Sequence, residues 1–560
     1  MDDTNFPTLD EIVGSSQDLV REVPIGLSGG IKSDSQLVSL SHILETLKKE
    51  EAEFNNHRNK IDSDEFKNDP HLFGISVPAS LRISKENNVV PLFEAQDHKK
   101  FLSGLETFKQ RDFEDTNKFD NLYFLHQTSS SHSEHSQGKV VEAGNFSSSH
   151  PSFDVVSVRK DFPILQETVN GRPLIWFDNA ATTQKPSSVI ERIKYFYEHE
   201  NSNIHRAAHE MAARATDAYE EARSKVAKFI GANSKNEIIF TRGATEAINL
   251  VAATLGQVHL SKDDEILITH LEHHANIVPW QQLALSKGAK IKVAPVDDNG
   301  VLLLEEFGRL LTNKTKLVSF THVSNALGTI TPAKTLIEMA HKVGAYVLVD
   351  GAQSVSHMKV NVQELNADFF VFSGHKLFAP TGIGVLYGKK QILERLPPYQ
   401  TGGNMIKDVT FERTVFNGSP ERFEAGTGNI ADAVGLGAAI DYVEKIGLDN
   451  IARYEHELLI YATEKICQIP NLKIIGRSPE KASLISFVIE GISSEEIGAK
   501  LNGYGIAVRS GHHCAQPILR RYNFESTVRP SFAFYNTFKE IDELVSALKI
   551  IAAETSFLSS

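Results

Sequence analysis

From about Phe153 to its C-terminus, the 560-residue chain alternates short apolar runs with helix-length amphipathic stretches. The apolar runs are rich in β-branched and aromatic residues, as buried strands are. A strand–helix–strand rhythm of this kind predicts a mainly parallel sheet that is buried on both faces. We therefore predict an α/β fold for this part of the chain. The runs are 235–241, 264–270, 290–296, 315–323, 345–354, 368–376 and 382–388.

The pattern changes after about Glu421, where two long helical stretches are followed by mixed strands and helices. The helices are expected at 431–446 and 448–469. This part of the sequence predicts a second, smaller α/β unit. We place the larger domain at about 172–415 and the smaller one at about 153–171 plus 416–560.

The first 150 residues differ in composition from the remainder of the chain. They hold 25 Asp and Glu against 15 Lys and Arg, and so carry most of the net charge of −13. The stretch 126–152 is rich in Ser and His and cannot bury enough apolar surface to offset its ordering entropy. We predict that 1–152 is a mostly disordered extension with a linker. Its short apolar islands suit docking on another surface.

The bulk sequence excludes several classes of protein. Two cysteines rule out a disulfide framework and fit a reducing compartment. No apolar run is long enough for a membrane span, and the acidic N-terminus is neither a secretory signal nor a transit peptide. The charge balance shows no nucleic-acid footprint. We expect a cytoplasmic protein that binds neither nucleic acid nor membrane.

Reactive side chains follow the predicted strands, and in open α/β sheets such groups gather at the carboxyl ends of strands. Asp350 and Gln353 follow one strand, and Ser373, His375 and Lys376 follow the next. An aspartate and a lysine at such positions are what a pyridoxal-phosphate site needs. The lysine forms a Schiff base, and the carboxylate keeps the pyridine nitrogen protonated.

A phosphate cradle is expected within 238–252, which is a strand, a glycine-containing turn and the start of a helix. The backbone amides of Gly243, Ala244 and Thr245, with the Thr245 hydroxyl, would face a phosphate at the positive end of that helix. Any strand–helix turn resembles this one, so the prediction gains specificity only beside Asp350 and Lys376.

Over some 400 residues from about Val158 the chain resembles the group II cysteine desulfurases, the Suf type. The resemblance implies the fold-type I architecture of pyridoxal-phosphate enzymes, with a mainly parallel seven-stranded sheet, and a homodimer. It also implies conversion of L-cysteine to L-alanine with a protein-bound persulfide. The matching motifs include "FDNAATTQKP", "NIHRAAHE", "TRGATEAINLVA", "EHHANIVPW", "THVSNALGT", "VDGAQS", "FSGHKLFAPTGIGVLYG", "RFEAGTGNIADAVGLGAAI" and "GIAVRSGHHCAQP".

The same resemblance assigns a role to each matching position. Lys376 would hold the cofactor and move the Cα proton, and Cys514 would attack the substrate sulfur. His273 would stack on the pyridine ring and assist proton transfer. The expected cofactor contacts are Asp350, Gln353, Ala244, Thr245, Ser373 and His375, with Thr427 reaching the phosphate of the partner subunit. The expected substrate contacts are Asn325, Arg529, Arg509, Arg206 and Asn179. No metal is expected.

Cys514 alone could be a small apolar residue, half of a disulfide, a metal ligand or a nucleophile. The cysteine count removes the disulfide, and no second His/Cys pair has zinc-ligand spacing. Its neighbours His512, His513 and Arg509 could lower its pKa from the ordinary value of about 8.5. Cys467, in contrast, is predicted to pack on an apolar helix face. Departures from the family pattern are Ala244, Gly428 and Pro530, and none touches a reacting atom.

Other functions stay open from the sequence. The same fold serves selenocysteine lyases and aminotransferases, for which Cys514 would be dispensable, and a carrier without chemistry is a third reading. The persulfide acceptor is expected to be of the SufE or SufU type, for iron–sulfur cluster assembly or sulfur storage. The extension resembles the segment that loads cysteine desulfurases into encapsulin shells. The alternatives are an arm that docks a sulfur acceptor and an inert tail.

Overall fold

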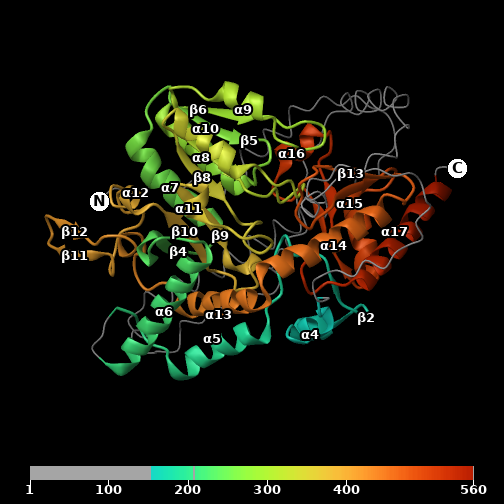
Figure 1. The fold of residues 1–560 in the computed structure, drawn as a ribbon, viewed down its shortest axis with the longest axis horizontal. Helices are drawn as coiled ribbons and strands as arrows, with labels where there is room; N and C mark the ends of the chain where they lie inside the picture. The colour runs from blue at the N-terminus through green and yellow to red at the C-terminus, as the bar shows by residue number, and fades with distance from the viewer. Residues whose placement is uncertain (1–152, 206–208, 559–560) are drawn as a thin grey trace, which may run out of the picture. The chain divides into compact units, whose positions relative to one another are not determined.

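The computed structural model describes residues 153–205 and 209–558, all of which belong to one compact unit (Figure 1). Our predictions for the extension 1–152 and for Arg206 lie outside the described residues. No helix of the described part combines the length and apolarity needed to cross a bilayer.

A seven-stranded sheet organises the fold and confirms the α/β, fold-type I prediction. All seven predicted runs form its strands. Neighbouring strands are parallel except at β10, which runs antiparallel to both of its neighbours. The order is β4 (Ile238–Thr241), β10 (Gly384–Gly388), β9 (Phe369–Ser373), β8 (Tyr346–Asp350), β7 (Thr315–Thr321), β5 (Glu265–Thr269) and β6 (Lys290–Ala294).

Both faces of the sheet are buried except at its edge strand β6, where Lys290 and Val293 are exposed. Successive side chains of a strand point to opposite sides of the sheet. In β9, Phe369 and Val371 belong to one hydrophobic cluster, whereas Phe370 and Phe372 belong to another. This explains why the strands read as continuous apolar runs rather than as an alternation. The first cluster also contains the apolar side of α7 (Ala244–His259).

Three helices pack together on one side of the sheet (Figure 1). These are α5 (Ser187–His199), α6 (Glu210–Phe229) and α13 (Ile430–Ile446). The start of α13 agrees with the prediction within one residue. The remaining helices around the large sheet are α8 (Val278–Lys287), α9 (Leu304–Leu310), α10 (Ala333–Lys342), α11 (Val362–Leu365) and α12 (Lys390–Leu393).

The C-terminal part forms a second, four-stranded antiparallel sheet with helices against it. Its strand order is β13 (Leu472–Ile475), β14 (Ser486–Ile489), β17 (Thr527–Arg529) and β16 (Arg509–Gly511). The accompanying helices are α14 (Leu448–Ile466), α15 (Ser494–Gly503), α16 (Gln516–Arg521) and α17 (Phe538–Leu558). The exact boundaries of a large and a small domain stay a prediction.

One prediction in this region is wrong. Helix α14 ends at Ile466, so Cys467 is its C-cap residue and is exposed rather than packed on an apolar face. The apolar periodicity of the sequence continues beyond Ile466, where the helix ends. The ends of a helix are the part that a sequence pattern predicts least reliably.

The shorter elements lie mostly at the N-terminal end of the described part and in the connections. They are α4 (Val155–Lys160), η4 (Pro163–Gln166), β1 (Thr168–Val169), β2 (Arg172–Pro173), β3 (Ile175–Trp176), η5 (Lys235–Glu237), η6 (His274–Asn276), η7 (Gly374–Lys376), β11 (Ile406–Val409), β12 (Thr414–Phe416), η8 (Glu421–Phe423) and β15 (Ile506–Ala507). Strand β15 pairs with β3, which joins the start of the described part to its C-terminal region.

Candidate active site

A cavity of about 250 Å³ lies at the carboxyl ends of the central strands and reaches the loop after β16. Twelve of the predicted site residues, far apart in sequence, are brought together in its wall. They are Ala244, Thr245, His273, Asn325, Asp350, Gln353, Ser373, His375, Lys376, Arg509, Cys514 and Arg529.

Asp350 and Lys376 stand at the ends of adjacent parallel strands, β8 and β9. Asp350 is 4% exposed, and its Oδ1 accepts a hydrogen bond from the Ala352 backbone over 2.9 Å. Burial raises the pKa of Asp350. Burial also lowers the pKa of Lys376 to about 8, although the Asp350 charge opposes the change. A lysine amine must be uncharged to act as a nucleophile, so this environment favours that role.

The turn that carries Lys376 is fixed through the carbonyl oxygen of His375. This oxygen accepts hydrogen bonds from Thr183 N at 3.0 Å, from the hydroxyls of Thr182 and Thr183 at 3.1 Å, and from Lys185 Nζ at 3.2 Å. Sequence reasoning missed these anchors. They lie within the motif "TTQKP", but nothing in the sequence shows that this motif faces residue 375.

His273 caps the short helix η6 and is held in one ring orientation. Its Nδ1 accepts a hydrogen bond from the Ala275 backbone over 3.0 Å. Burial, followed by the charge of Lys376, lowers the pKa of His273 to about 3. The ring is therefore neutral at physiological pH, with its hydrogen on Nε2.

The segment predicted to hold the phosphate lies at the N-terminus of α7. The Ala244 backbone donates to Ser373 Oγ over 2.9 Å, which fastens the start of α7 to the end of β9. A Cβ on Gly384 would lie 2.8 Å from the Gly243 nitrogen, so β10 can approach this turn only through a glycine. The N-terminus of a 16-residue helix is a favourable place for an anion.

Arg529 lies buried beside the same cavity. Its Nη1 donates to the Asn325 carbonyl over 2.7 Å, and its Nη2 lies 3.5 Å from Asp178 Oδ1. Its Nε has no hydrogen-bond partner within 153–205 and 209–558. Burial lowers the pKa of Arg529 to about 10, so the guanidinium stays charged at neutral pH. The side chain is suited to bind a carboxylate.

Cys514 lies on the loop between β16 and α16 and is partly buried in the cavity wall. The backbone of His513 and Cys514 is left-handed, with φ of +52° and +53°. Asn325 Nδ2 donates to the His513 carbonyl over 2.7 Å and so holds this loop to the strand-end loop after β7. Non-glycine residues in this conformation store strain and concentrate at functional sites.

Two predicted residues lie away from the cavity. The buried Asn179 donates to the Ser531 carbonyl over 2.6 Å and accepts from the Tyr535 hydroxyl, so it ties an early segment to a late one. Thr427 is exposed, and its hydroxyl lies 3.3 Å from Asn203 Oδ1. The role expected of Thr427 involves a partner subunit and stays a prediction.

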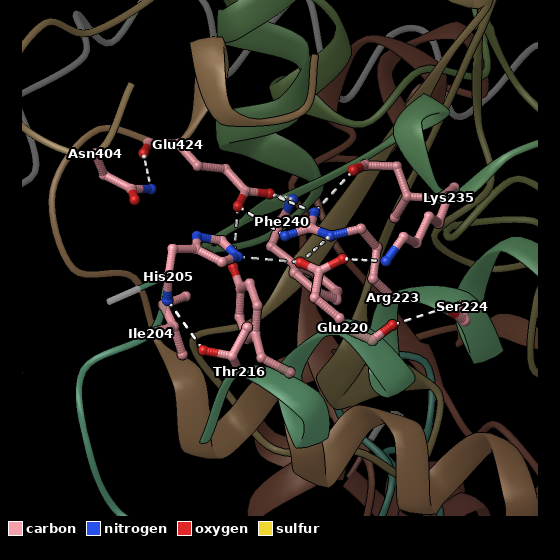
Figure 2. A network of polar contacts seen from close by, with 12 residues as sticks. Ile204, His205, Thr216, Glu220, Arg223, Ser224, Lys235, Phe240, Asn404 and Glu424 are labelled. Carbon is pink, nitrogen blue, oxygen red and sulfur yellow. Dashed lines mark hydrogen bonds and ion pairs between the residues drawn. The ribbon is translucent and has the colours of Figure 1, made fainter. Parts of the chain in front are cut away.

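A network of charged side chains centred on the buried Arg223 joins His205, Glu220 and Glu424 (Figure 2). Arg223 has no exposed surface and binds Glu424 through two hydrogen bonds of 2.6 and 2.9 Å. Its Nε also binds Glu220, which lies 3.4 Å from His205. Sequence reasoning missed this network because helical charges usually face solvent. The motif "RFEAGTGN" contains Glu424 without revealing its partner.

The comparisons with known proteins identify the class of this chain. The family model described as aminotransferase class-V matches residues 175–544, and the chain belongs to that family. Its relatives are named cysteine desulfurases. The chain is 64% identical over 408 residues to a cysteine desulfurase of Synechococcus elongatus, a match that covers 73% of this chain and 65% of the relative.

Further relatives and solved structures agree. The chain is 49% identical to a probable cysteine desulfurase of Halalkalibacterium halodurans. The match covers 70% of this chain and 96% of the relative. The apo structure of a cysteine desulfurase from Thermococcus onnurineus NA1 has a TM-score of 0.68 at 40% identity, with 71% of this chain and 98% of that chain covered. The chain matches slightly less than two thirds of the first curated relatives, 62–66% of their length.

Pyridoxal phosphate is the cofactor of this class, and the residues of the cavity fit it. Asp350 is a buried carboxylate that forms no ion pair with any described residue, as a partner for a cationic ring nitrogen should. Lys376 supplies the amine, and the neutral His273 supplies a flat ring. The start of α7, with Ser373, offers donors and a positive helix end to a phosphate.

Proposed function

We propose that this chain is a cysteine desulfurase of the group II, Suf type, which converts L-cysteine to L-alanine and leaves the sulfur as a persulfide on Cys514. The observation that carries the proposal is that the Cys514 thiol and the Lys376 amine share one cavity with the buried Asp350. Transamination does not require a thiol in the cavity. A reaction that removes sulfur from its substrate does, because the thiol receives that sulfur.

The surrounding residues divide the work. Bound pyridoxal phosphate supplies an electron sink for charge that develops at the substrate Cα. Lys376 holds the cofactor and moves the Cα proton, because its pKa of about 8 lets it both accept and release one near neutral pH. Asp350 would pair with the ring nitrogen of the cofactor, and His273 would provide an uncharged stacking surface. Gln353 Nε2 is already bonded to the Ala180 carbonyl at 2.6 Å, so its orientation is fixed.

Substrate binding falls to the cationic side of the cavity. The Arg529 guanidinium is buried and charged, and its Nε forms no hydrogen bond with a described residue, so we assign the substrate carboxylate to it together with Asn325. Arg509 pairs in register with Arg529 across β16 and β17 and also lines the cavity. Two guanidinium groups beside one another favour binding of an anionic group between them.

Cys514 then takes the sulfur. Its thiolate attacks the sulfur of the bound cysteine, so one S–S bond forms as the substrate C–S bond breaks. The carbon fragment takes up protons and leaves as alanine, while the transferred sulfur stays on Cys514 as a persulfide. The thiolate rather than the thiol is the nucleophile in such a step.

The test uses the full chain loaded with pyridoxal phosphate and measures alanine formation from L-cysteine with a thiol reductant. We expect Cys514→Ala to abolish turnover while the cofactor absorbance stays, and Lys376→Ala to remove both. Cys467→Ser is the matched control, because this exposed cysteine lies outside the cavity. Full cysteine turnover by Cys514→Ala would refute the persulfide. Selenocysteine turnover that survives in this variant would favour a selenocysteine lyase.

We also assign Thr427 to the cofactor phosphate of the partner subunit in a homodimer, and Arg206 to the substrate-binding cleft beside Arg509. Support for Thr427 comes from its place outside the described cavity wall of its own chain and from the network around Glu424, three residues before it. Mixed dimers test this assignment. We combine one Thr427→Ala chain with one Lys376→Ala chain, so that only one site of the dimer keeps Lys376. If Thr427 acts across the interface, this site receives an intact Thr427 from the other chain and should be fully active. If Thr427 acts within its own chain, the same site should be impaired.

The persulfide acceptor is proposed to be a partner of the SufE or SufU type, which delivers sulfur for iron–sulfur cluster assembly. The loop that bears Cys514 is short, since only four residues separate Gly511 of β16 from Gln516 of α16. Such a loop cannot carry a persulfide far, so the acceptor has to approach the cavity. Addition of a purified acceptor should raise turnover, and equal turnover at every acceptor concentration would contradict this step.

For the extension 1–152 we propose loading into an encapsulin shell in the cytoplasm. Support comes from its acidic composition and its apolar islands. In addition, about a third of the first curated relatives also lies outside the matched part. Residues 1–152 fused to a fluorescent protein should copurify with assembled shells on coexpression. Fluorescence that never enters the shell fraction would leave a docking arm for a sulfur acceptor as the alternative.

A further inference from the structure

Two histidines, His512 and His274, form hydrogen bonds with the backbone of the loop that carries Cys514. The Cys514 backbone N–H donates to His512 Nδ1 over 3.0 Å. The Cys514 carbonyl accepts from the His274 backbone N–H over 2.7 Å. The Gln516 N–H lies 3.3 Å from His274 Nε2 and donates to it. His274 belongs to the η6 turn beside the large sheet, so it joins that sheet to the Cys514 loop.

The direction of these hydrogen bonds fixes the charge state of both rings. A backbone N–H can only donate, so His512 Nδ1 and His274 Nε2 must each present a lone pair. A neutral imidazole has one such nitrogen, whereas an imidazolium has none. Protonation of either ring therefore removes a hydrogen bond that holds the loop.

The surroundings of the His274 ring disfavour its protonation. The rings of His274 and His512 are stacked, with centroids 5.7 Å apart and planes inclined by 27°. The charged or titratable groups that face His274 are basic: His273, with its ring at 6.2 Å, His512, and Arg520. Burial, then His512 and Arg520, lower the pKa of His274.

The backbone conformation makes the loop depend on these bonds. His513 and Cys514 are two successive non-glycine residues with positive φ. Such a conformation persists only where the surrounding contacts over-determine it. Two of those contacts come from uncharged imidazole rings, and a third is the Asn325 bond to the His513 carbonyl.

We propose that His274 and His512 are positioning residues for the Cys514 thiol, which they keep in the cavity wall only while both rings are uncharged. The inference rests on the proposed desulfurase function, in which Cys514 is the nucleophile. The two histidines need not touch the substrate. They act through the backbone of the loop, and uptake of a proton by either ring releases it.

The matched variants are His512→Asn and His512→Ala in the full chain loaded with pyridoxal phosphate. An asparagine oxygen can accept the N–H two residues ahead, as in an Asx turn, but cannot be protonated near neutral pH. Asparagine therefore keeps the hydrogen bond without the titration, whereas alanine loses both.

The first measurement is the rate of Cys514 alkylation by iodoacetamide at pH 8, followed by peptide mass spectrometry. The exposed Cys467 is the internal reference thiol. We expect His512→Ala to raise the ratio of Cys514 to Cys467 alkylation about fivefold, the factor that corresponds to one ordinary hydrogen bond. His512→Asn should stay close to the parent chain. This readout does not require desulfuration, so it stands even if the proposed function fails.

The second measurement is the rate of alanine formation between pH 5.5 and 9. Activity of the parent chain should fall on the acid side, and His512→Asn should retain activity to lower pH with the same KM for cysteine. The proposal is overturned if alanine and asparagine behave alike in alkylation, or if the asparagine variant keeps the acid limb of the parent. If His512→Ala fails to bind the cofactor, the rate of alanine formation by His512→Asn at low pH tests the proposal by itself.

Discussion

Asn325 donates from its Nδ2 to the His513 carbonyl oxygen over 2.7 Å, which fastens the strand-end loop after β7 to the loop that bears Cys514. The Asn325 carbonyl in turn accepts a hydrogen bond from Arg529 over 2.7 Å. One residue thus links the nucleophile loop with the buried guanidinium assigned to the substrate carboxylate. The position of the thiol and that of the substrate are coupled through it.

We predict that Asn325→Ala lowers kcat/KM for L-cysteine by about tenfold to a hundredfold, since it removes both the loop anchor and a substrate contact. The loss should appear in kcat as well as in KM, because a displaced thiol slows sulfur transfer to Cys514. Steady-state alanine formation measures both. The cofactor absorbance is the control for folding, and a change confined to KM would show that the loop does not depend on Asn325.

Gly384 provides a prediction about the phosphate cradle. Gly384→Ala would place a Cβ against the backbone of Gly243, 2.8 Å from its nitrogen, and backbone cannot yield as a flexible side chain does. We expect at least about a tenfold loss of pyridoxal-phosphate affinity, in line with the sensitivity of a close backbone approach to an added Cβ. Titration of the apoprotein, followed by absorbance, measures it. Gly418→Ala is the control, because an added Cβ there meets nothing within 4 Å.

The sequence predicts those parts of the fold that depend on local pattern. The strands of the large sheet appear where the apolar runs predict them, because both faces of the central strands are covered. The edge strand β6 carries Lys290 and Lys292 and is partly exposed. Asp350 and Lys376 follow from the rule that reactive groups gather at strand ends. Neither prediction requires knowledge of a contact between distant residues.

What the sequence does not predict depends on contacts across hundreds of residues. Thr183 and Lys185 reach the His375 carbonyl, and Arg223 reaches Glu424, only because the fold brings separate segments together. Asn179 stands within a motif beside the site, yet it faces Ser531 rather than the cavity. A motif shows that a residue matters but does not show which way its side chain points.

Lys376 sets an expected pH dependence for cofactor loading. Its pKa in the folded chain is lowered to about 8, below the ordinary value for lysine, so the amine becomes uncharged as pH rises through about 8. The rate of pyridoxal-phosphate incorporation into the apoprotein should therefore rise with pH and level off above that value. Stopped-flow absorbance from pH 6.5 to 10 measures it. Lys376→Ala should show no incorporation, and a midpoint near 10.5 would mean that the cavity does not perturb the amine.

The Arg223–Glu424 pair yields a prediction about stability. Arg223→Met leaves the buried Glu424 without its guanidinium, and loss of one partner of a buried ion pair costs about 3–5 kcal/mol. The urea midpoint of the full chain should fall accordingly. The double variant Arg223→Met with Glu424→Gln should recover part of the loss, because no uncompensated carboxylate remains buried.

The exposed pair Lys359–Asp449 provides the matched control for this prediction. Both of its side chains are more than two thirds accessible, so Lys359→Met should change the urea midpoint little. If Arg223→Met is no more destabilising than Lys359→Met, the buried network does not fix the segment beside Thr427. In that case the assignment of Thr427 to the partner's site loses its structural support, because the network is what holds the chain between Glu424 and Thr427 against α6.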